Sequence, residues 1–162
     1  MVCNALADDR LTLMGLFMEA HAGLAAEMTR RLERACGISA SSFEILVRLA
    51  RSPEGRLRMT DLASQVALSS SGLTRAVDRL EKLGLVRREP CPTDRRAAYA
   101  AITPDGTARI EEAAEVHIEH VEEIFTGLLT VEQRSALEEA LRIVRDNLNP
   151  GALMGAEAPP AR

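Results

Sequence analysis

The sequence predicts a mainly α-helical protein that contains one small β-hairpin. Of the 162 residues, 46% are apolar and 27% are charged, which suits a single domain of ordinary size with a hydrophobic core. Aromatic residues make up only 2% and Trp is absent, so aliphatic residues, Ala and Met must fill the core, and this mixture favours helices. In most segments the apolar residues recur every three or four positions, the spacing of amphipathic helices.

The first expected helix is long and runs from Asp8 to Cys36. Gly37 follows it directly, and glycine commonly ends a helix because it adopts the left-handed conformation without strain. The apolar stripe of this helix comprises Met14, Phe17, His21, Leu24, Met28, Leu32 and Ala35.

A second helix is expected next, with Ser39 or Ser41 as its N-cap. Glu44 lies three residues after Ser41, which is the spacing of a reciprocal capping box. The segment Ser-Pro-Glu-Gly at 52–55 then ends the helix, and residues 56–58 form a short strand. The inner face expected for this helix comprises Phe43, Leu46, Val47 and Ala50.

Two short helices joined by a turn come after that strand. Thr60 begins the first, and the second begins in the Ser-Ser-Ser-Gly segment at 69–72, which offers several N-caps, and ends at Gly84. Two such helices, of which the second is basic, are typical of a helix-turn-helix. The residues expected to be buried are Leu62, Ala63 and Val66 in the first helix and Leu73, Val77, Leu80 and Leu83 in the second.

A hairpin is expected after the helix-turn-helix, with strands at 85–89 and 98–102 around the turn-rich segment 90–96. Its charged tip makes it a wing. Thr103 and Pro104 then supply the N-cap and the first residue of another helix. The apolar face of that helix comprises Ile110, Ala114, His117, Val121, Ile124 and Leu128.

The last helix is expected to start at a capping box formed by Thr130 and Gln133. Residues 149–162 are rich in Gly, Pro and Ala and are expected to form a flexible tail. The apolar face of the last helix comprises Leu137, Leu141, Val144 and Leu148.

The formal net charge of −4 is unevenly distributed. Residues 56–103 carry nine Arg or Lys residues against five acids, so the rest of the chain is strongly acidic. This polarisation suits a protein that turns one basic face toward phosphate groups. The nine basic residues are Arg56, Arg58, Arg75, Arg79, Lys82, Arg87, Arg88, Arg95 and Arg96.

Two motifs carry a family resemblance. Residues 68–89 read Leu-Ser-Ser-Ser-Gly-Leu-Thr-Arg-Ala-Val-Asp-Arg-Leu-Glu-Lys-Leu-Gly-Leu-Val-Arg-Arg-Glu, and Asp94-Arg95-Arg96 precedes Ile-Thr-Pro-Asp-Gly at 102–106. With these motifs, the chain resembles the MarR family of winged helix-turn-helix transcription regulators over about residues 10–148. Ile102 stands where the family usually has Leu.

The resemblance implies a homodimer in which the first and the last two helices of two chains pair while two winged lobes straddle duplex DNA. It divides the chain into a helical dimerisation region at 8–36 and 104–148, a DNA-binding lobe at 39–103 and a tail at 149–162. The expected function is repression, or less often activation, of transcription from a pseudo-palindromic operator with half-sites about one helical turn apart.

Candidate DNA contacts follow from the helix at 69–83. Because its apolar stripe faces inward, Ser70, Ser71, Thr74, Arg75 and Arg79 are left facing outward. Arg75 is the best candidate to read a base, since a guanidinium can donate two hydrogen bonds to guanine, whereas the hydroxyl groups would contact phosphates. In the wing, the resemblance implies that Arg96 enters the minor groove, that Asp94 orients Arg96 and that Arg95 contacts the DNA backbone.

Three kinds of effector site remain open. His21 and His117 lie on apolar stripes and are candidates to line a pocket for a phenolic or other anionic ligand, although such histidines are more often hydrogen-bonded core residues. His117 and His120 are weak candidates for a metal site, with His21 or one of the acids Glu115, Glu119 and Glu123 as a further ligand. Oxidation of Cys3, or of Cys91 in the basic wing loop, is a third route.

Other classes of protein fit less well. There is no nucleophile elbow, no phosphate-binding glycine loop and no HExxH motif, so we expect neither an enzyme nor a cofactor. No signal peptide or membrane-spanning run is visible, and three scattered cysteines suit a reducing compartment, so we expect a soluble cytoplasmic protein with no membrane partner. The alternative is a winged-helix module that binds another protein and has no affinity for DNA.

Overall fold

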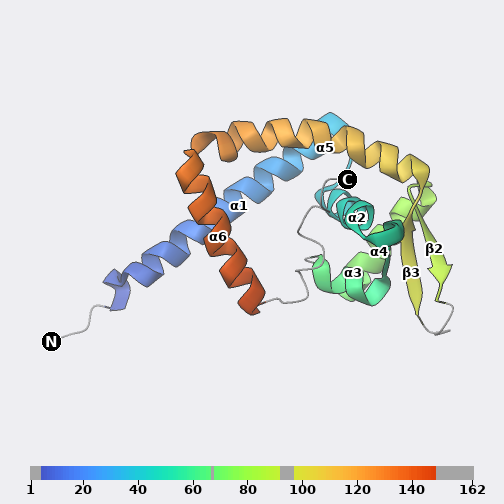
Figure 1. Cartoon of the computed structure of the whole chain (residues 1–162), viewed down its shortest axis with the longest axis horizontal. Helices are drawn as coiled ribbons and strands as arrows, with labels where there is room; N and C mark the ends of the chain where they lie inside the picture. The colour runs from blue at the N-terminus through green and yellow to red at the C-terminus, as the bar shows by residue number, and fades with distance from the viewer. Residues whose placement is uncertain (1–4, 67, 92–96, 149–162) are drawn as a thin grey trace.

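The computed structural model describes residues 5–66, 68–91 and 97–148, and it is mainly helical with one small sheet (Figure 1). The helices are α1 (Asp9–Cys36), α2 (Ala40–Arg51), α3 (Met59–Gln65), α4 (Ser70–Lys82), α5 (Pro104–Ile124) and α6 (Val131–Leu148); three 3-10 turns are Ala5–Ala7, Pro53–Gly55 and Thr126–Leu128. A lobe of short helices and the sheet hangs below one end of two long helices, and the last helix descends from the other end of α5 and crosses α1 in this view.

The predicted hairpin is part of an antiparallel sheet of three strands. Strands β2 (Val86–Pro90) and β3 (Ala98–Ile102) pair over five residues, and β1 (Arg56–Arg58) pairs with the other edge of β3. The sheet therefore closes one side of the lobe, with α3 and α4 forming a helix-turn-helix beside it. This arrangement is the expected winged helix-turn-helix.

Most of the predicted helix ends are confirmed. The side chain of Asp8 accepts a hydrogen bond at the start of α1, and Gly37 ends that helix with φ of +63°. Thr130 and Gln133 form the expected reciprocal capping box, with distances of 2.9 Å from the Thr130 amide and 3.3 Å from the Gln133 amide.

The capping box predicted for α2 is wrong. Ser39, and not Ser41, is the N-cap, because its hydroxyl accepts from the Ser42 amide while Ser41 already lies in the first turn. Glu44 forms an ion pair with Arg48 at 3.7 Å instead. In this helix the capping position was set by the earlier of two suitable serines.

The main core lies inside the lobe and differs in detail from the predicted stripes. On α2 the buried positions are Ser42, Ile45, Leu46 and Leu49, one residue earlier than the predicted set, and Ala50 is exposed. Both sets have the same helical spacing, so spacing alone does not separate them. The fully buried core side chains come from α2, α3, α4 and the sheet: Ile45, Leu46, Leu49, Leu62, Leu73, Val77, Leu80 and Val86.

Three other predicted core positions lie elsewhere. Leu83 is the C-cap of α4 and is 70% exposed, because the helix ends where the stripe would have placed it against the lobe. On α5, Ala113 is fully buried and Ala114 only partly. Leu128 is 73% exposed, because α5 ends at Ile124 and Leu128 belongs to the following 3-10 turn.

The start of α5 is fastened to the lobe by a close backbone contact. A Cβ atom on Gly106 would lie 2.1 Å from the Leu85 carbonyl oxygen, so only glycine fits there. The Thr103 hydroxyl accepts from the Gly106 amide at 3.0 Å and donates to the Gly84 carbonyl at 2.7 Å. These bonds join the first turn of α5 to the turn between α4 and β2.

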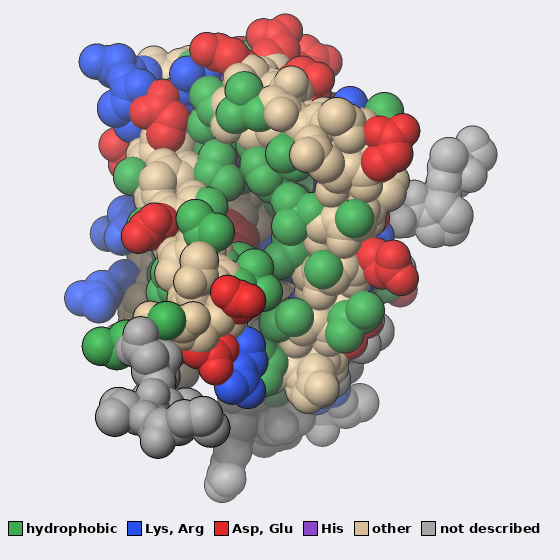
Figure 2. Space-filling model, turned by 90° about the vertical axis from the view of Figure 1, so that its left-hand side faces the viewer, with side chains coloured by type: hydrophobic (Ala, Val, Ile, Leu, Met, Phe, Trp, Pro, Cys, Tyr) green, Lys and Arg blue, Asp and Glu red, His purple; other side chains and the backbone are tan. Residues whose placement is uncertain are grey.

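Helices α1 and α6 leave much of their apolar surface uncovered. Only Leu32 and Cys36 of α1 are buried, and no residue of α6 is. Figure 2 shows apolar side chains running down the face to which both helices contribute. No described helix combines the length and the apolar character that crossing a bilayer requires.

Candidate nucleic-acid interface

The outer face of α4 carries all five side chains predicted for that helix. Ser70, Ser71, Thr74, Arg75 and Arg79 are exposed, while Leu73, Ala76, Val77 and Leu80 are buried beneath them. The Ser69 hydroxyl caps the helix by accepting from the Gly72 amide at 3.1 Å. The N-terminal half of α4 is therefore a polar and basic surface at the positive end of a helix dipole.

The guanidinium groups on this face are free to meet a ligand. Among the described residues, no acidic side chain pairs with Arg75, Arg79 or Lys82. By contrast, Arg56 pairs with Glu54 and Glu89, and Arg87 pairs with Glu89 at 2.8 Å. Within the described part of the lobe, Arg56 and Arg87 of the sheet are thus paired with acids, whereas the basic side chains on the outer face of α4 are not.

Arg88 joins β2 to α4. Its Nη1 atom lies 2.6 Å from Asp78 and 2.8 Å from Glu81, and its backbone amide donates to Glu81 at 3.0 Å. Its Nη2 atom donates to the Thr74 carbonyl at 3.5 Å. The bonds to Asp78, followed by those to Glu81, raise the pKa of Arg88 above its ordinary value. Sequence patterns did not single out this link, since it depends on the angle between a helix and a strand.

A second polar cluster lies at the base of the wing, on the outer face of the sheet. Arg58 donates to the Tyr99 hydroxyl at 3.2 Å, and the guanidinium carbons of Arg56 and Arg58 lie 5.2 and 5.7 Å from the centre of the Tyr99 ring. Only the register of β1 against β3 reveals this cluster. The predicted wing-tip residues Asp94, Arg95 and Arg96 lie outside the described residues, as does Cys3.

The two histidines proposed for an effector pocket lie far apart within one chain. His21 is exposed, with its ring 6.4 Å from that of Phe17. His117 is half-buried, with its ring 4.5 Å from that of Phe43. Phe43 packs against Cys36, which follows His21 by fifteen residues, or about 22 Å along α1. One chain alone does not bring the two imidazoles together.

His120 lines a hollow of about 360 Å³ between α1 and α5, together with Arg30, Arg31, Arg34 and Ala35. Its Nδ1 atom and that of His117 are both buried and have no hydrogen-bond partner among the described residues. Glu123, which could have completed a metal site, is bound by Arg31 at 2.5 Å. Over residues 5–66, 68–91 and 97–148, no three His, Cys, Asp or Glu side chains lie together as metal ligands would.

Comparison with known proteins gives a consistent result. Residues 38–98 match the sequence model of the MarR family. The HTH-type transcriptional regulator YdgJ of Bacillus subtilis is 30% identical over 119 residues, covering 74% of this chain and 71% of that protein. The HTH-type transcriptional repressor MdtR of the same species is 27% identical over 107 residues, covering 66% and 64%.

A solved structure extends the likeness to most of the fold. Sco3205 of Streptomyces coelicolor, a MarR family transcriptional regulator crystallised in complex with DNA, superposes with a TM-score of 0.80 at 38% identity, covering 88% of this chain and 89% of that one. The helix-turn-helix and the long flanking helices are thus both shared with a protein that binds DNA.

The environment of His117 predicts a loss of stability in acid. Burial, followed by the nearby charge of His120, lowers the pKa of His117 below 6.5. As the pH falls below about 6.5, the unfolded chain takes up this proton first, so the free energy of unfolding decreases until the pH has passed the folded-state pKa. We expect urea unfolding between pH 7 and pH 5 to show this decrease, by at most about 1.4 kcal/mol per pH unit for one group.

The variant His117→Gln should remove that part of the pH dependence. The variant His21→Gln, at an exposed position on α1, should show the same dependence of unfolding free energy on pH as the unmodified protein. Equal slopes for the unmodified protein and His117→Gln would show that other groups cause the effect.

Proposed function

Because the chain belongs to the MarR family of transcriptional regulators, we propose that it acts in the cytoplasm as a homodimeric repressor that binds a pseudo-palindromic operator. Its relatives are regulators and not enzymes. The observation that carries the proposal is that Arg75 and Arg79 lie on the exposed face of a capped helix and have no acidic partner in the part of the chain that the structure describes. Two lobes bound about one helical turn apart would compete with RNA polymerase for the same DNA.

Recognition is assigned to α4 and the wing. The N-terminal half of α4 enters the major groove, where Arg75 reads a guanine while Ser70, Ser71 and Thr74 contact phosphates. Arg79 lies one turn later and supplies a further contact. At the wing tip we assign Arg96 to the minor groove, with Asp94 orienting it and Arg95 on the backbone.

We assign the contact between the two copies of the chain to the uncovered faces of α1 and α6. Monomeric proteins rarely expose large continuous apolar patches, and the one here runs over both helices (Figure 2). The exposed side chains are Leu11, Leu13, Met14, Leu16, Phe17 and Met18 on α1, and Val131, Leu141, Ile143, Val144 and Leu148 on α6. Residues 8–36 and 104–148 are accordingly the dimerisation region that we propose.

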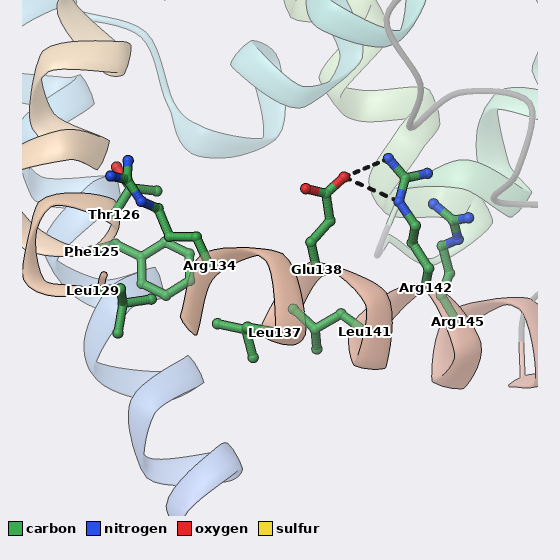
Figure 3. A pocket seen from close by; sticks show the side chains of 9 residues that line it. All are labelled: Phe125, Thr126, Leu129, Arg134, Leu137, Glu138, Leu141, Arg142 and Arg145. Atoms are coloured by element: carbon green, nitrogen blue, oxygen red, sulfur yellow. Dashed lines mark hydrogen bonds and ion pairs between the residues drawn. The ribbon is translucent and has the colours of Figure 1, made fainter. Parts of the chain in front are cut away.

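A hollow of about 550 Å³ along α6 suits the insertion of a partner helix. Phe125, Leu129, Leu137 and Leu141 provide its apolar lining. Figure 3 shows Leu137 and Leu141 on one side of α6 and the charged residues, including the bonded pair Glu138 and Arg142, on the other. An amphipathic helix can cover such a surface with its own apolar stripe.

Release from DNA is assigned to a small effector, a phenolic or other anionic compound. His117 lies where α5 packs against α2. In a pocket that contains both histidines, His21 would belong to the second copy of the chain. The ligand would act by binding better to a dimer whose lobes are wrongly spaced for DNA.

Substitution of Arg75 tests base recognition. Arg75→Ala should weaken binding to the preferred operator by about 1–3 kcal/mol and relax the preference at one or two base pairs. Fluorescence anisotropy with a set of operators changed one base pair at a time measures both effects. Equal weakening on every duplex would identify Arg75 as a phosphate contact.

A salt titration separates DNA binding from the alternative of a protein-binding module. Each phosphate contact should lower the logarithm of affinity by about 0.9 for every tenfold rise in salt, so we expect a steep linear dependence. Absence of duplex binding at low salt, or an affinity that does not change with salt concentration, would favour a protein-binding module.

The dimer interface is tested by a charge on α6. Leu141→Glu should give monomers in light scattering, together with weak operator binding, because burying an unpaired carboxylate is costly. Leu83→Glu places the same charge on an exposed leucine of the lobe and should leave the protein dimeric. A dimeric Leu141→Glu protein would place the interface elsewhere.

A further inference from the structure

Three points along α4 are held by one side chain from the wing. Arg88 of β2 reaches the Thr74 carbonyl and the carboxylates of Asp78 and Glu81. These residues follow one another at i, i+4 and i+7, so they form one line along about 10 Å of the helix. A single contact would let the helix pivot, whereas contacts spread over two turns fix its direction relative to the strand.

The position of Arg88 makes it unsuited to contact DNA itself. Its side chain is 30% exposed, and its guanidinium already donates to two carboxylates and a carbonyl. Arg75 and Arg79, by contrast, have no acidic partner among the described residues. The functional role of Arg88 must therefore be exerted through the groups that it holds.

The same contacts neutralise the acids of the recognition helix. Asp78 and Glu81 are the only carboxylates in α4, and both lie within 2.8 Å of Arg88. Left unpaired, they would repel the phosphates that Arg75 and Arg79 approach, an effect that would weaken binding to any duplex equally.

We propose that Arg88 is a positioning residue that holds α4 at a fixed angle to the wing, so that helix and wing reach adjacent grooves of the same duplex together. The proposal rests on the function proposed above. Its consequence is that loss of Arg88 lowers the affinity for the operator more than the affinity for DNA of random sequence, because only the former needs both elements in register.

The experiment uses the full-length protein and two duplexes of equal length: the sequence that the unmodified protein enriches from a random library, and a scrambled version of it. Arg88→Gln should weaken binding to the enriched duplex about tenfold or more and binding to the scrambled duplex by less than about threefold. The salt slope on both duplexes should stay unchanged, since no phosphate contact is lost.

Glu81→Ala makes the test sharper because an effect of net charge and an effect of helix position predict different changes in DNA binding. Removing an acid near DNA should tighten binding if net charge alone matters. The proposal instead requires the operator preference to fall, by less than in Arg88→Gln because Asp78 and Thr74 still bind Arg88. Combining both substitutions should lower the preference little more than Arg88→Gln alone, because the contact with Glu81 is already lost in that variant.

Arg109→Gln is the matched control. Arg109 is 33% exposed, pairs with Glu112 at 2.8 Å and donates to the Cys36 carbonyl, yet it lies on α5, away from the recognition helix. It should lower the melting temperature about as much as Arg88→Gln and leave the operator preference unchanged.

Three results would overturn the proposal. A salt slope reduced by about one in Arg88→Gln would make Arg88 a phosphate contact. An unchanged operator preference, with only the melting temperature lowered, would make its role structural. Tighter operator binding by Glu81→Ala would show that charge outweighs position. If the unmodified protein enriches no sequence, the proposed function itself fails, and the role of Arg88 is then rejected with it.

Discussion

Burial of one stripe of α4 determines which residues the protein can offer to DNA. Leu73, Val77 and Leu80 enter the core of the lobe together with side chains from α2, α3 and the sheet, and this sets the rotation of α4 about its own axis. Arg75 and Arg79 are exposed as a result, and the Ser69 cap keeps the N-terminal turn intact beside them. Removing one of the buried side chains would leave a cavity in the lobe and lower the stability of the protein.

Much of this fold could be predicted from residue spacing, capping and turn residues, because these signals are local. Gly37, Thr103 and the Thr130–Gln133 box mark helix ends that the structure confirms. The predictions from sequence were wrong where the burial of a residue depends on the rest of the chain. The stripe of α2 is shifted by one residue, so that Ile45 is buried and Ala50 exposed, because the lobe and not the helix decides which of two equally spaced sets is covered.

The candidate site divides in the same way. The five outward residues of α4 could be identified in advance, since an amphipathic helix with a known buried stripe leaves only one exposed face. The sequence also showed the excess of basic residues in the lobe, but it could not show which of them are neutralised. Arg87 and Arg88 are paired with acids, while Arg75 has no acidic partner within residues 5–66, 68–91 and 97–148. This difference depends on distances between elements that are adjacent only after folding.

The junction at Gly106 gives α5 the mechanical role of a lever. Because its first turn is fastened to the backbone of Leu85 and Gly84, the helix and the lobe must move as one piece. A helix of 21 residues is about 31 Å long, so a tilt of about 5° at the α6 end displaces the lobe by roughly 3 Å. That is close to the rise of one base pair. In the dimer that we propose, small rearrangements where the two chains meet would therefore be magnified into a mismatch with the operator.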